Sequence, residues 1–351
     1  MTDTELLGRV AGIIDPFARY LHGLRRGGRW LVALPREREA FSRTLALYQP
    51  QRLAARMMVR AVDLLFRAGC QRAALARVDL KPVAQELSPP LTGIEPGSCG
   101  ILLGSPEHRV PRAIASYRNA GRWEVAKIAF GTEGASNLEQ EARTLDELSS
   151  RVKGVPDLLG MHRGGDATVL RMPYLTGESI PTGDSHAALD LLQSWITETA
   201  AMPISHFPEW PGIEAALVGN DAGKMVLEKL SRHMLVPVIS HGDFARWNLR
   251  RQADGSLVAL DWEWGHANGM PGIDLVHYLL QDARLVRKKP PTEAIGETID
   301  ALRQPASEEY LKRTGWNEDP LLPVIACLAW KQGARHQDNA EILNVILNFE
   351  F

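Results

Sequence analysis

Four polar residues stand close together in the sequence at a spacing that suits phosphoryl transfer. An apolar run leads to His241 and Asp243, and Asn248 follows five residues after Asp243. A second apolar run, Leu-Val-Ala-Leu, leads to Asp261. One carboxylate can accept the proton of a hydroxyl group, and an amide oxygen with a second carboxylate can hold Mg²⁺, which prefers oxygen ligands. We therefore expect Asp243 to be a catalytic base and Asn248 and Asp261 to bind Mg²⁺.

Taken singly, Asp243 and Asn248 would each be read as turn residues, since Asp and Asn are common in turns. The combined pattern is far more specific, because Asp261 follows Asn248 by thirteen residues and comes directly after an apolar strand. A buried acid at a strand end costs free energy unless it is paired or holds a metal. For His241 we expect a supporting role, an orienting hydrogen bond within the catalytic loop.

The His-Gly-Asp motif with its Asn, and the Asp-Trp-Glu motif that begins at Asp261, resemble the catalytic and metal-binding motifs of the aminoglycoside phosphotransferase and choline-kinase-like family. The segment around Asp274 also resembles a downstream element of that family, whose Asp usually has a structural role. The resemblance covers about residues 98–340 and leaves residues 1–90 outside. It implies a two-lobed protein-kinase-like fold, with ATP (GTP is possible) and Mg²⁺ as cofactors.

A kinase-like fold needs a lysine held by a glutamate to contact the ATP phosphates. Lys127 shares one face of a predicted strand with Val125 and Ala129, since side chains alternate along a strand. On the helix that follows, Glu141 lies on the apolar stripe, which favours it over Glu139 as the partner. The alternatives are an ordinary buried salt bridge and an extended lysine beside a solvated glutamate.

Two further nucleotide contacts follow from the resemblance. The stretch through Pro173, Tyr174 and Leu175 resembles the connector between the two lobes, and its backbone would meet the adenine edge; the alternative is a simple exit from a strand. The Gly-x-Gly-x-x-Gly loop that covers phosphates in kinases is absent. Ser105, between the first two predicted strands of the sheet, is the candidate on that side.

Periodicity divides the chain into three segments and predicts an α+β protein. Residues 1–90 form an N-terminal, mostly helical extension, with helices at 40–47 and 53–68. Residues 91–176 form a small antiparallel-sheet lobe that binds nucleotide, with strands at 100–103, 112–118, 123–130 and 168–175 and a helix at 137–149. Residues 177–351 form a helical catalytic and substrate lobe with two short strands. A Pro/Gly-rich stretch near residue 90 is the best linker.

Charge is unevenly distributed along the 351 residues. The net charge is −2, but residues 1–90 carry 15 Lys and Arg against 8 Asp and Glu. This basic segment fits either an anionic partner, such as a membrane surface, or the acidic remainder of the same chain. The acidic remainder would instead suit a cationic acceptor. The sequence shows no transmembrane segment, signal peptide or nucleic-acid motif, and its three separated cysteines suit a reducing cytoplasm.

The pattern as a whole predicts a phosphotransferase that moves the γ-phosphoryl group of ATP to a hydroxyl of a small molecule, such as a sugar, an amino sugar or an amino alcohol. A protein acceptor is less favoured, because the loop between Asp261 and Pro271 is short. The alternative is a nucleotide-binding pseudokinase or scaffold in a surface-polysaccharide pathway. The chain retains Lys127, Asp243, Asn248 and Asp261, which speaks against that alternative, since degenerate kinases usually lose at least one such group.

Overall fold

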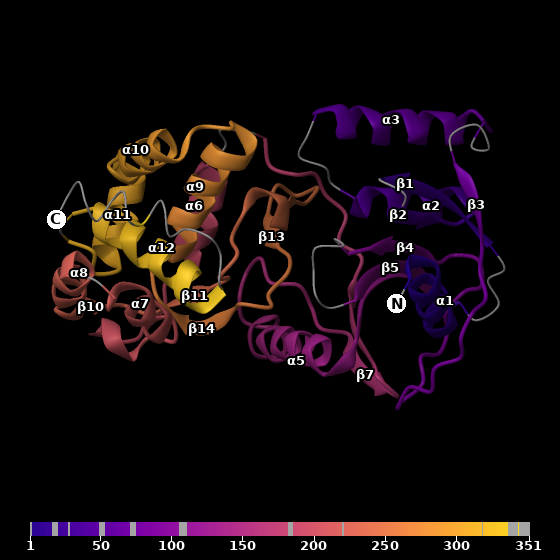
Figure 1. Cartoon of the computed structure of the whole chain (residues 1–351), viewed down its shortest axis with the longest axis horizontal. Coiled ribbons are helices and arrows are strands. Elements are labelled where there is room, and N and C mark those ends of the chain that lie inside the picture. Colours follow the sequence, from indigo (N-terminus) through magenta and orange to yellow (C-terminus); the bar gives the residue numbers. More distant parts are fainter. Residues whose placement is uncertain are drawn as a thin grey trace. The chain divides into compact units, whose positions relative to one another are not determined.

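Figure 1 shows the computed structural model of the chain. It describes residues 2–15, 20–26, 29–48, 53–70, 75–104, 111–181, 185–219, 221–317, 319–335 and 343. The chain divides into two compact units, Met1–Asp146 with Pro156–Leu175 (unit 1) and Glu147–Val155 with Thr176–Phe351 (unit 2). Unit 1 is built on an antiparallel sheet and unit 2 is mainly helical, so the predicted α+β class is confirmed.

The sheet of unit 1 has eight strands in the order β3-β1-β2-β4-β5-β6-β8-β7, and each neighbouring pair is antiparallel. The strands are β1 (Tyr20–Arg26), β2 (Arg29–Leu34), β3 (Ala76–Asp79), β4 (Gly100–Leu103), β5 (Arg112–Asn119), β6 (Arg122–Phe130), β7 (Gly160–Gly164) and β8 (Ala167–Pro173). The four strands predicted by alternation are present. The short strand β7 is an addition, and its glycines at both ends gave little strand signal.

The faces of this sheet are covered by different helices. Ala126 and Ile128 of β6 belong to a buried apolar cluster that also contains Leu7 and Val10 of α1 (Asp3–Ile14). Lys127 alternates with these residues and faces the opposite side, where Glu141 of α5 (Gly131–Leu148) meets it. The strand alternation therefore separates a dry apolar layer from the layer that carries the charged pair.

The N-terminal segment differs from the prediction. Its helices α2 (Arg38–Leu47) and α3 (Leu53–Arg67) match the helices predicted at 40–47 and 53–68, but with α1 they cover fewer than half of its described residues, so it is not mostly helical. It also supplies strands β1, β2 and β3, and β2 pairs with β4, so residues on both sides of position 90 share one sheet and one unit. These strands were not predicted because arginines interrupt their apolar alternation. β2 pairs with the neighbouring β1 and also with β4, about seventy residues away in the sequence.

Unit 2 contains helices α6 (His186–Ser194), α7 (Trp210–Leu217), α8 (Asp221–Ser231), α9 (Ile273–Gln281), α10 (Pro291–Leu302), α11 (Pro305–Arg313) and α12 (Leu321–Arg335), with the short turns η1 (Ile204–His206), η2 (Arg246–Asn248) and η3 (Asp282–Val286). Its strands are β9 (Met202–Pro203), β10 (Met234–Leu235), β11 (Val238–Ser240), β12 (Leu249–Arg251), β13 (Leu257–Ala259) and β14 (His266–Gly269). They form three two-stranded ribbons, β9–β10, β11–β14 and β12–β13.

Aromatic side chains fill the space around the loop of residues 241–248 in unit 2. Trp195, Trp262 and Phe244 are fully buried, and the ring of Trp195 contacts the rings of the other two at 5.2 and 5.4 Å. Aromatic pairs in tilted contact add to the stability that comes from area burial alone. The loop that carries Asp243 therefore rests on a rigid apolar base. None of the helices in the described ranges is long and apolar enough to cross a membrane.

Candidate functional site

The loop of residues 241–248, the candidate catalytic loop, begins where β11 ends. β11 pairs with β14, and His241 is the first residue after the strand. The carboxylate of Asp274, at the start of α9, accepts the backbone N–H of His241 at 2.6 Å and that of Gly242 at 2.9 Å. Asp274 is 3% exposed, and burial raises its pKa, while contacts with His241 and Lys331 oppose the rise. This is the structural role that the motif implied for Asp274.

Gly242 lets the chain turn sharply between His241 and Asp243. Its φ is +75°, in the left-handed region, and an added Cβ would lie 2.5 Å from the carbonyl oxygen of Trp264. Any side chain here would meet both backbone strain and a steric clash. Glycine is therefore required at the centre of the His-Gly-Asp motif.

The imidazole of His241 links the two strands that carry the polar residues. Its Nε2 donates to the carbonyl oxygen of Leu260 at 2.8 Å, and its Nδ1 accepts the backbone N–H of Asp243 at 3.2 Å. These partners select the neutral tautomer with the proton on Nε2. Burial lowers the pKa of His241, which favours the same neutral form. His241 thus orients the loop through hydrogen bonds, as its place in the motif predicted.

The carboxylate of Asp243 is held from two sides. Its Oδ1 lies 3.0 Å from Nε2 of His277 on α9 and 3.5 Å from Nζ of Lys331 on α12. Its Oδ2 lies 3.2 Å from Nδ2 of Asn248. The side chains of His277 and Lys331 are 4% and 2% exposed, whereas that of Asp243 is 22% exposed. The aspartate therefore has a buried, anchored side and a side open to solvent.

Asn248 is tied to the same carboxylate. Its Nδ2 also donates to the backbone carbonyl oxygen of Asp243 at 2.9 Å. Since the amide nitrogen faces Asp243, the amide oxygen points to the other side, which is the end that a hard cation prefers. This contact explains why Asn248 follows Asp243 by five residues, because the turn η2 brings Asn248 back next to Asp243.

Asp261 reaches the neighbourhood of Asn248 through the β12–β13 ribbon. Leu249 pairs with Ala259, and the backbone N–H of Leu260 donates to the carbonyl oxygen of Asn248 at 2.7 Å. Asp261 is therefore the residue that follows the position opposite Asn248. Its φ is +73°, an uncommon value for a residue with a side chain and one that concentrates at functional sites.

The donor set suits Mg²⁺ better than a metal held by protein alone. Within the described ranges, no group of three or more His, Cys, Asp and Glu side chains could hold a metal ion. Mg²⁺ usually takes one or two carboxylates and completes its shell with phosphates and water. Asn248 and Asp261 offer one amide oxygen and one carboxylate, and this fits a metal that arrives with a nucleotide.

In unit 1 the predicted pair is present. Nζ of Lys127 lies 2.6 and 2.7 Å from the two carboxylate oxygens of Glu141, whose side chain is 1% exposed. The competing Glu139 instead pairs with Arg163. The choice of Glu141 over Glu139 is confirmed. A buried carboxylate that accepts hydrogen bonds from one ammonium with both of its oxygens restricts the position of that ammonium.

The connector lies at the end of β8. Pro173 pairs with Glu124, and the backbone N–H of Tyr174 continues the ladder by donating to the carbonyl oxygen of Trp123 at 3.0 Å. The hydroxyl of Tyr174 donates to the carbonyl oxygen of Arg43 on α2 at 2.8 Å. The backbone N–H and the hydroxyl of Tyr174 are thus occupied by the sheet and by α2, so an adenine edge would have to bind other backbone groups of this stretch. Leu175 is half-buried, and Ser105 lies outside the described residues.

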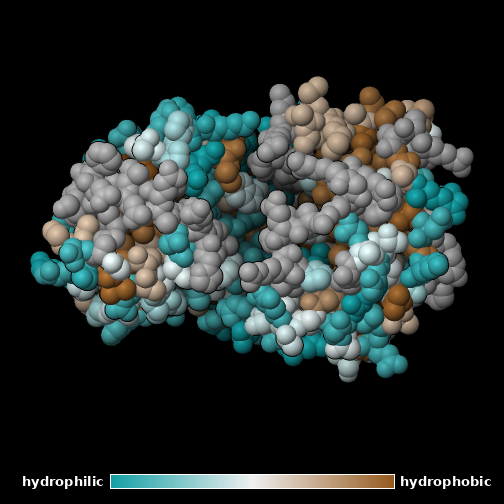
Figure 2. All heavy atoms as spheres, in the orientation of Figure 1, coloured by the Kyte–Doolittle hydropathy of each residue, from teal (hydrophilic) through white to brown (hydrophobic). Residues whose placement is uncertain are grey.

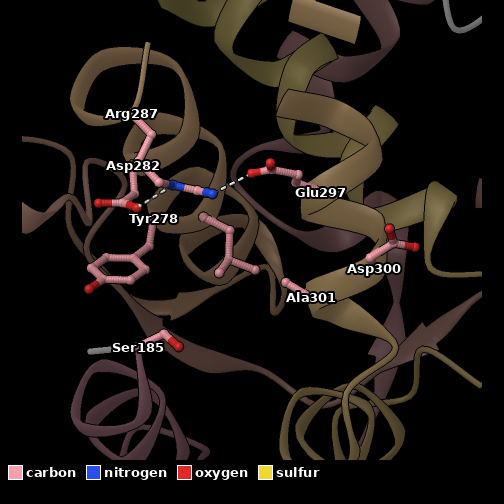
Figure 3. A pocket seen from close by; sticks show the side chains of 8 residues that line it. Ser185, Tyr278, Asp282, Arg287, Glu297, Asp300 and Ala301 are labelled. Atoms are coloured by element: carbon pink, nitrogen blue, oxygen red, sulfur yellow. Dashed lines mark hydrogen bonds and ion pairs between the residues drawn. The ribbon is translucent and has the colours of Figure 1, made fainter. Parts of the chain in front are cut away.

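A pocket of about 380 Å³ opens in unit 2 and is lined mainly by residues of α9, η3 and α10 (Figure 3). Tyr278 lines it and contacts the ring of Phe244, the residue after Asp243, at 5.9 Å. Arg287 bridges Asp282 and Glu297 across the pocket. The described lining consists of Ser185, Tyr278, Leu279, Asp282, Arg287, Glu297, Asp300 and Ala301, with three carboxylates and one guanidinium. Each carboxylate is already paired with a cation, since Arg287 holds Asp282 and Glu297 and Arg303 lies 3.5 Å from Asp300.

Two residues of the site were not anticipated from the sequence. His277 lies three residues after Asp274 on α9, and one helix turn places both on the side that faces the catalytic loop. Lys331 stands in the apolar run of α12, and its Nζ donates to the carbonyl oxygen of Gly242 at 2.5 Å. A lone lysine in an otherwise buried helix is the signal that could have identified it, because such a charge needs a partner.

Comparison with known proteins finds matches among solved structures only. No protein-family model and no curated protein sequence matches the chain. Aminoglycoside phosphotransferase APH(3'')-Id from Streptomyces rimosus is 18% identical, with 61% of this chain and 88% of that chain covered and a TM-score of 0.37. Aminoglycoside phosphotransferase APH(4)-Ia is 11% identical, with 72% and 94% covered and a TM-score of 0.49.

A further solved structure is described as a fructosamine-3-kinase from Haemophilus somnus. It is 15% identical to this chain, the match covers 73% of this chain and 90% of that chain, and the TM-score is 0.47. The resemblance to aminoglycoside phosphotransferases, predicted from the motifs, is thus also found among solved structures. At these identities and scores, the function has to be argued from the residues of this chain.

Proposed function

We propose that the chain is an ATP- and Mg²⁺-dependent phosphotransferase that acts on a hydroxyl group of a small molecule. The observation that carries the proposal is the arrangement of Asp243 and Asn248, with Asp261 following the strand paired to β12. Phosphoryl transfer uses groups of this kind. They are the partly exposed carboxylate of Asp243, the amide oxygen of Asn248, which is turned away from it, and the carboxylate of Asp261, whose backbone is left-handed. The Lys127–Glu141 pair in unit 1 adds the expected phosphate contact.

Each residue has a distinct task in this proposal. Asp243 accepts the proton of the acceptor hydroxyl as the oxygen attacks the γ-phosphorus, and ADP leaves with the electrons of the broken bond. Lys127 contacts the nucleotide phosphates, and Asn248 and Asp261 hold Mg²⁺, which supplies positive charge to the phosphates when it is bound. General-base help accounts for about 10²- to 10⁴-fold in rate, so orientation of the reactants supplies much of the remainder.

The acceptor is proposed to be a hydroxyl compound with a cationic group, such as an amino sugar or an amino alcohol. The pocket lined by α9, η3 and α10 supports this through one of its carboxylates, that of Asp282. Oδ1 of Asp282 is buried and has no hydrogen-bond partner among the described residues, and an ammonium group of a ligand would satisfy it. The basic charge of residues 1–90 does not enter this choice, since the pocket belongs to unit 2.

Nucleotide binding tests the metal half of the proposal. The melting temperature of the full chain is measured with ATP and with GTP, each with and without Mg²⁺. We expect a rise of several degrees that needs Mg²⁺, because a ligand that binds only the folded state stabilises it. Asp261→Asn should abolish the rise. Asp254→Asn is the matched control, since Asp254 lies in the exposed turn of the same β12–β13 ribbon.

Phosphoryl transfer tests the catalytic half. Amino sugars and amino alcohols are screened as acceptors by the release of ADP, and Asp243→Asn is compared with the wild-type chain. Asp243→Asn should keep the Mg²⁺-dependent thermal shift and lose turnover. A chain that binds MgATP but transfers to no acceptor would point to the pseudokinase alternative, and unchanged turnover in Asp243→Asn would refute the assigned base.

A further inference from the structure

Helix α3 has an unusual outer face. Its inner face packs on an apolar cluster of unit 1 through Val62 and Phe66, with Phe66 stacked on Phe41 of α2 at a ring distance of 3.6 Å. On the outer face, Met57 and Leu64 are 62% and 67% exposed. These are the two highest exposed fractions among the large hydrophobic side chains that the structure describes. Both faces of the helix are therefore apolar, and only one is covered within the described residues.

The exposed apolar residues form one continuous stripe. They recur at alternating intervals of three and four residues, which keeps them on one side of a helix. All five members are exposed: Ala54, Met57, Ala61, Leu64 and Ala68. Figure 2 shows this as hydrophobic colour gathered over α3. Single exposed apolar residues are ordinary on a protein surface, but a stripe along four turns of a helix marks an interaction surface.

Positive charge accompanies the stripe. Arg56, Arg60 and Arg67 are exposed and are spaced by four and seven residues, which places them in a row along one edge of the stripe. The acid of this helix, Asp63, pairs with Arg67 at 2.8 Å. These arginines contribute to the net positive charge of residues 1–90. A second copy of the same helix would bring its own positive charge, which opposes self-association.

We propose that the outer face of α3 binds an anionic lipid surface. The stripe would lie in the boundary between headgroups and acyl chains, and the arginine row would contact lipid phosphates while its aliphatic stems stay on the apolar side. Met57 and Leu64 are the only large members of the stripe, so the binding is reversible and depends on lipid charge. The surface is made by unit 1 alone and is independent of the phosphotransferase proposal.

Vesicle sedimentation of the full chain tests this surface. Vesicles of pure phosphatidylcholine are compared with vesicles in which one lipid in three is phosphatidylglycerol. We expect binding about tenfold or more tighter to the anionic vesicles, and weaker binding as salt is raised, because exposed charges are screened. The double variant Met57→Glu/Leu64→Glu should lose at least about tenfold in affinity. Arg56→Glu/Arg60→Glu should remove the preference for the anionic vesicles.

Matched controls separate this role from general surface effects. Met225 on α8 is 50% exposed, and Met225→Glu should leave vesicle binding unchanged. The α3 variants should melt at the wild-type temperature, since glutamate is a good helix former at exposed positions. Cys70 is exposed while Cys99 and Cys327 are buried, so an environment-sensitive fluorophore on Cys70 reports the end of the helix. Its emission should shift to the blue only with anionic vesicles.

Several results would overturn the proposal. Equal binding to both kinds of vesicle, no binding to either, or full binding by Met57→Glu/Leu64→Glu would each exclude an anionic lipid surface at α3. Sedimentation velocity in the absence of vesicles decides on the rival occupant. A dimer that forms in the wild-type chain and is lost in the same double variant would show that a second copy covers this face.

Discussion

Nε2 of His277 lies 3.0 Å from Oδ1 of Asp243, the same oxygen that Nζ of Lys331 approaches at 3.5 Å. The contact fixes one oxygen of the carboxylate within the protein. In the proposed reaction, the contact thereby determines how Asp243 faces an acceptor hydroxyl, because a base must lie within hydrogen-bond reach of the proton that it takes. His277 is a positioning residue in this arrangement.

Replacing His277 should slow catalysis without weakening nucleotide binding. His277→Leu removes the hydrogen bond to a charged group, which is worth about 1.5–3 kcal/mol, so kcat should fall about 10- to 100-fold. KM for ATP should stay within about twofold, since that half of the reaction does not use the contact. His277→Gln retains an N–H donor and should recover part of kcat. Equal losses in both variants, or a loss confined to KM, would contradict the positioning role.

The Lys127–Glu141 pair should show different costs for single and double replacement. Glu141 is 1% exposed, so Lys127→Met leaves a buried carboxylate without its cation and should destabilise unit 1 by about 3–5 kcal/mol. The double variant Lys127→Met/Glu141→Met removes both charges and should be more stable than the single variant. Chemical denaturation measures both. If the double variant is the less stable one, the pair stabilises the fold beyond its role as a charge partner.

The buried Glu209 should make stability fall as pH rises. Burial raises the pKa of Glu209 from 4.5 to about 7, and hydrogen bonds from the N–H of Met270 and the hydroxyl of Ser240 oppose the rise. The nearby carboxylate of Asp274 adds to it. Between these two pKa values the folded state binds more protons than the unfolded state, so the free energy of unfolding decreases with pH by about 3 kcal/mol in total.

Glu209→Gln isolates this effect. The variant should match the wild-type chain near pH 4, where the carboxyl group is protonated in both the folded and the unfolded state. It should be the more stable of the two near pH 8, where the wild-type chain must bury a charge. Denaturant titrations at both pH values provide the comparison. The assigned pKa shift is wrong if the difference between the two chains does not change with pH.

Helix α1 depends on a close approach of backbones. An added Cβ at Gly12 would lie 1.8 Å from the carbonyl oxygen of Val83, and the N–H of Val83 donates to the carbonyl oxygen of Gly8 at 3.0 Å. Gly12→Ala should therefore destabilise the chain by about 1–3 kcal/mol, because overpacking forces the two segments apart. Gly296 lies in an exposed helix position with open space around it. Thermal melts compare the two variants, and Gly296→Ala should leave the melting temperature unchanged or raise it slightly.

The local parts of this protein follow from the sequence. Strand alternation placed Lys127, the helical stripe selected Glu141, and the spacing of Asp243, Asn248 and Asp261 indicated one loop and one strand end. These inferences succeed because each depends on residues within about twenty positions of one another, where the periods of helix and strand govern geometry. Their roles in binding nucleotide and metal stay predictions.

Only the tertiary structure determines which distant residues contact these local elements. The pairing of β2 with β4, and the contacts of Asp243 with His277 and Lys331, join residues that are about 30 to 90 positions apart. No local period encodes such contacts, because they depend on which packed arrangement buries the most apolar surface and leaves every buried charge a partner. The same global packing leaves Met57 and Leu64 exposed, although the sequence of α3 is apolar on that side as well.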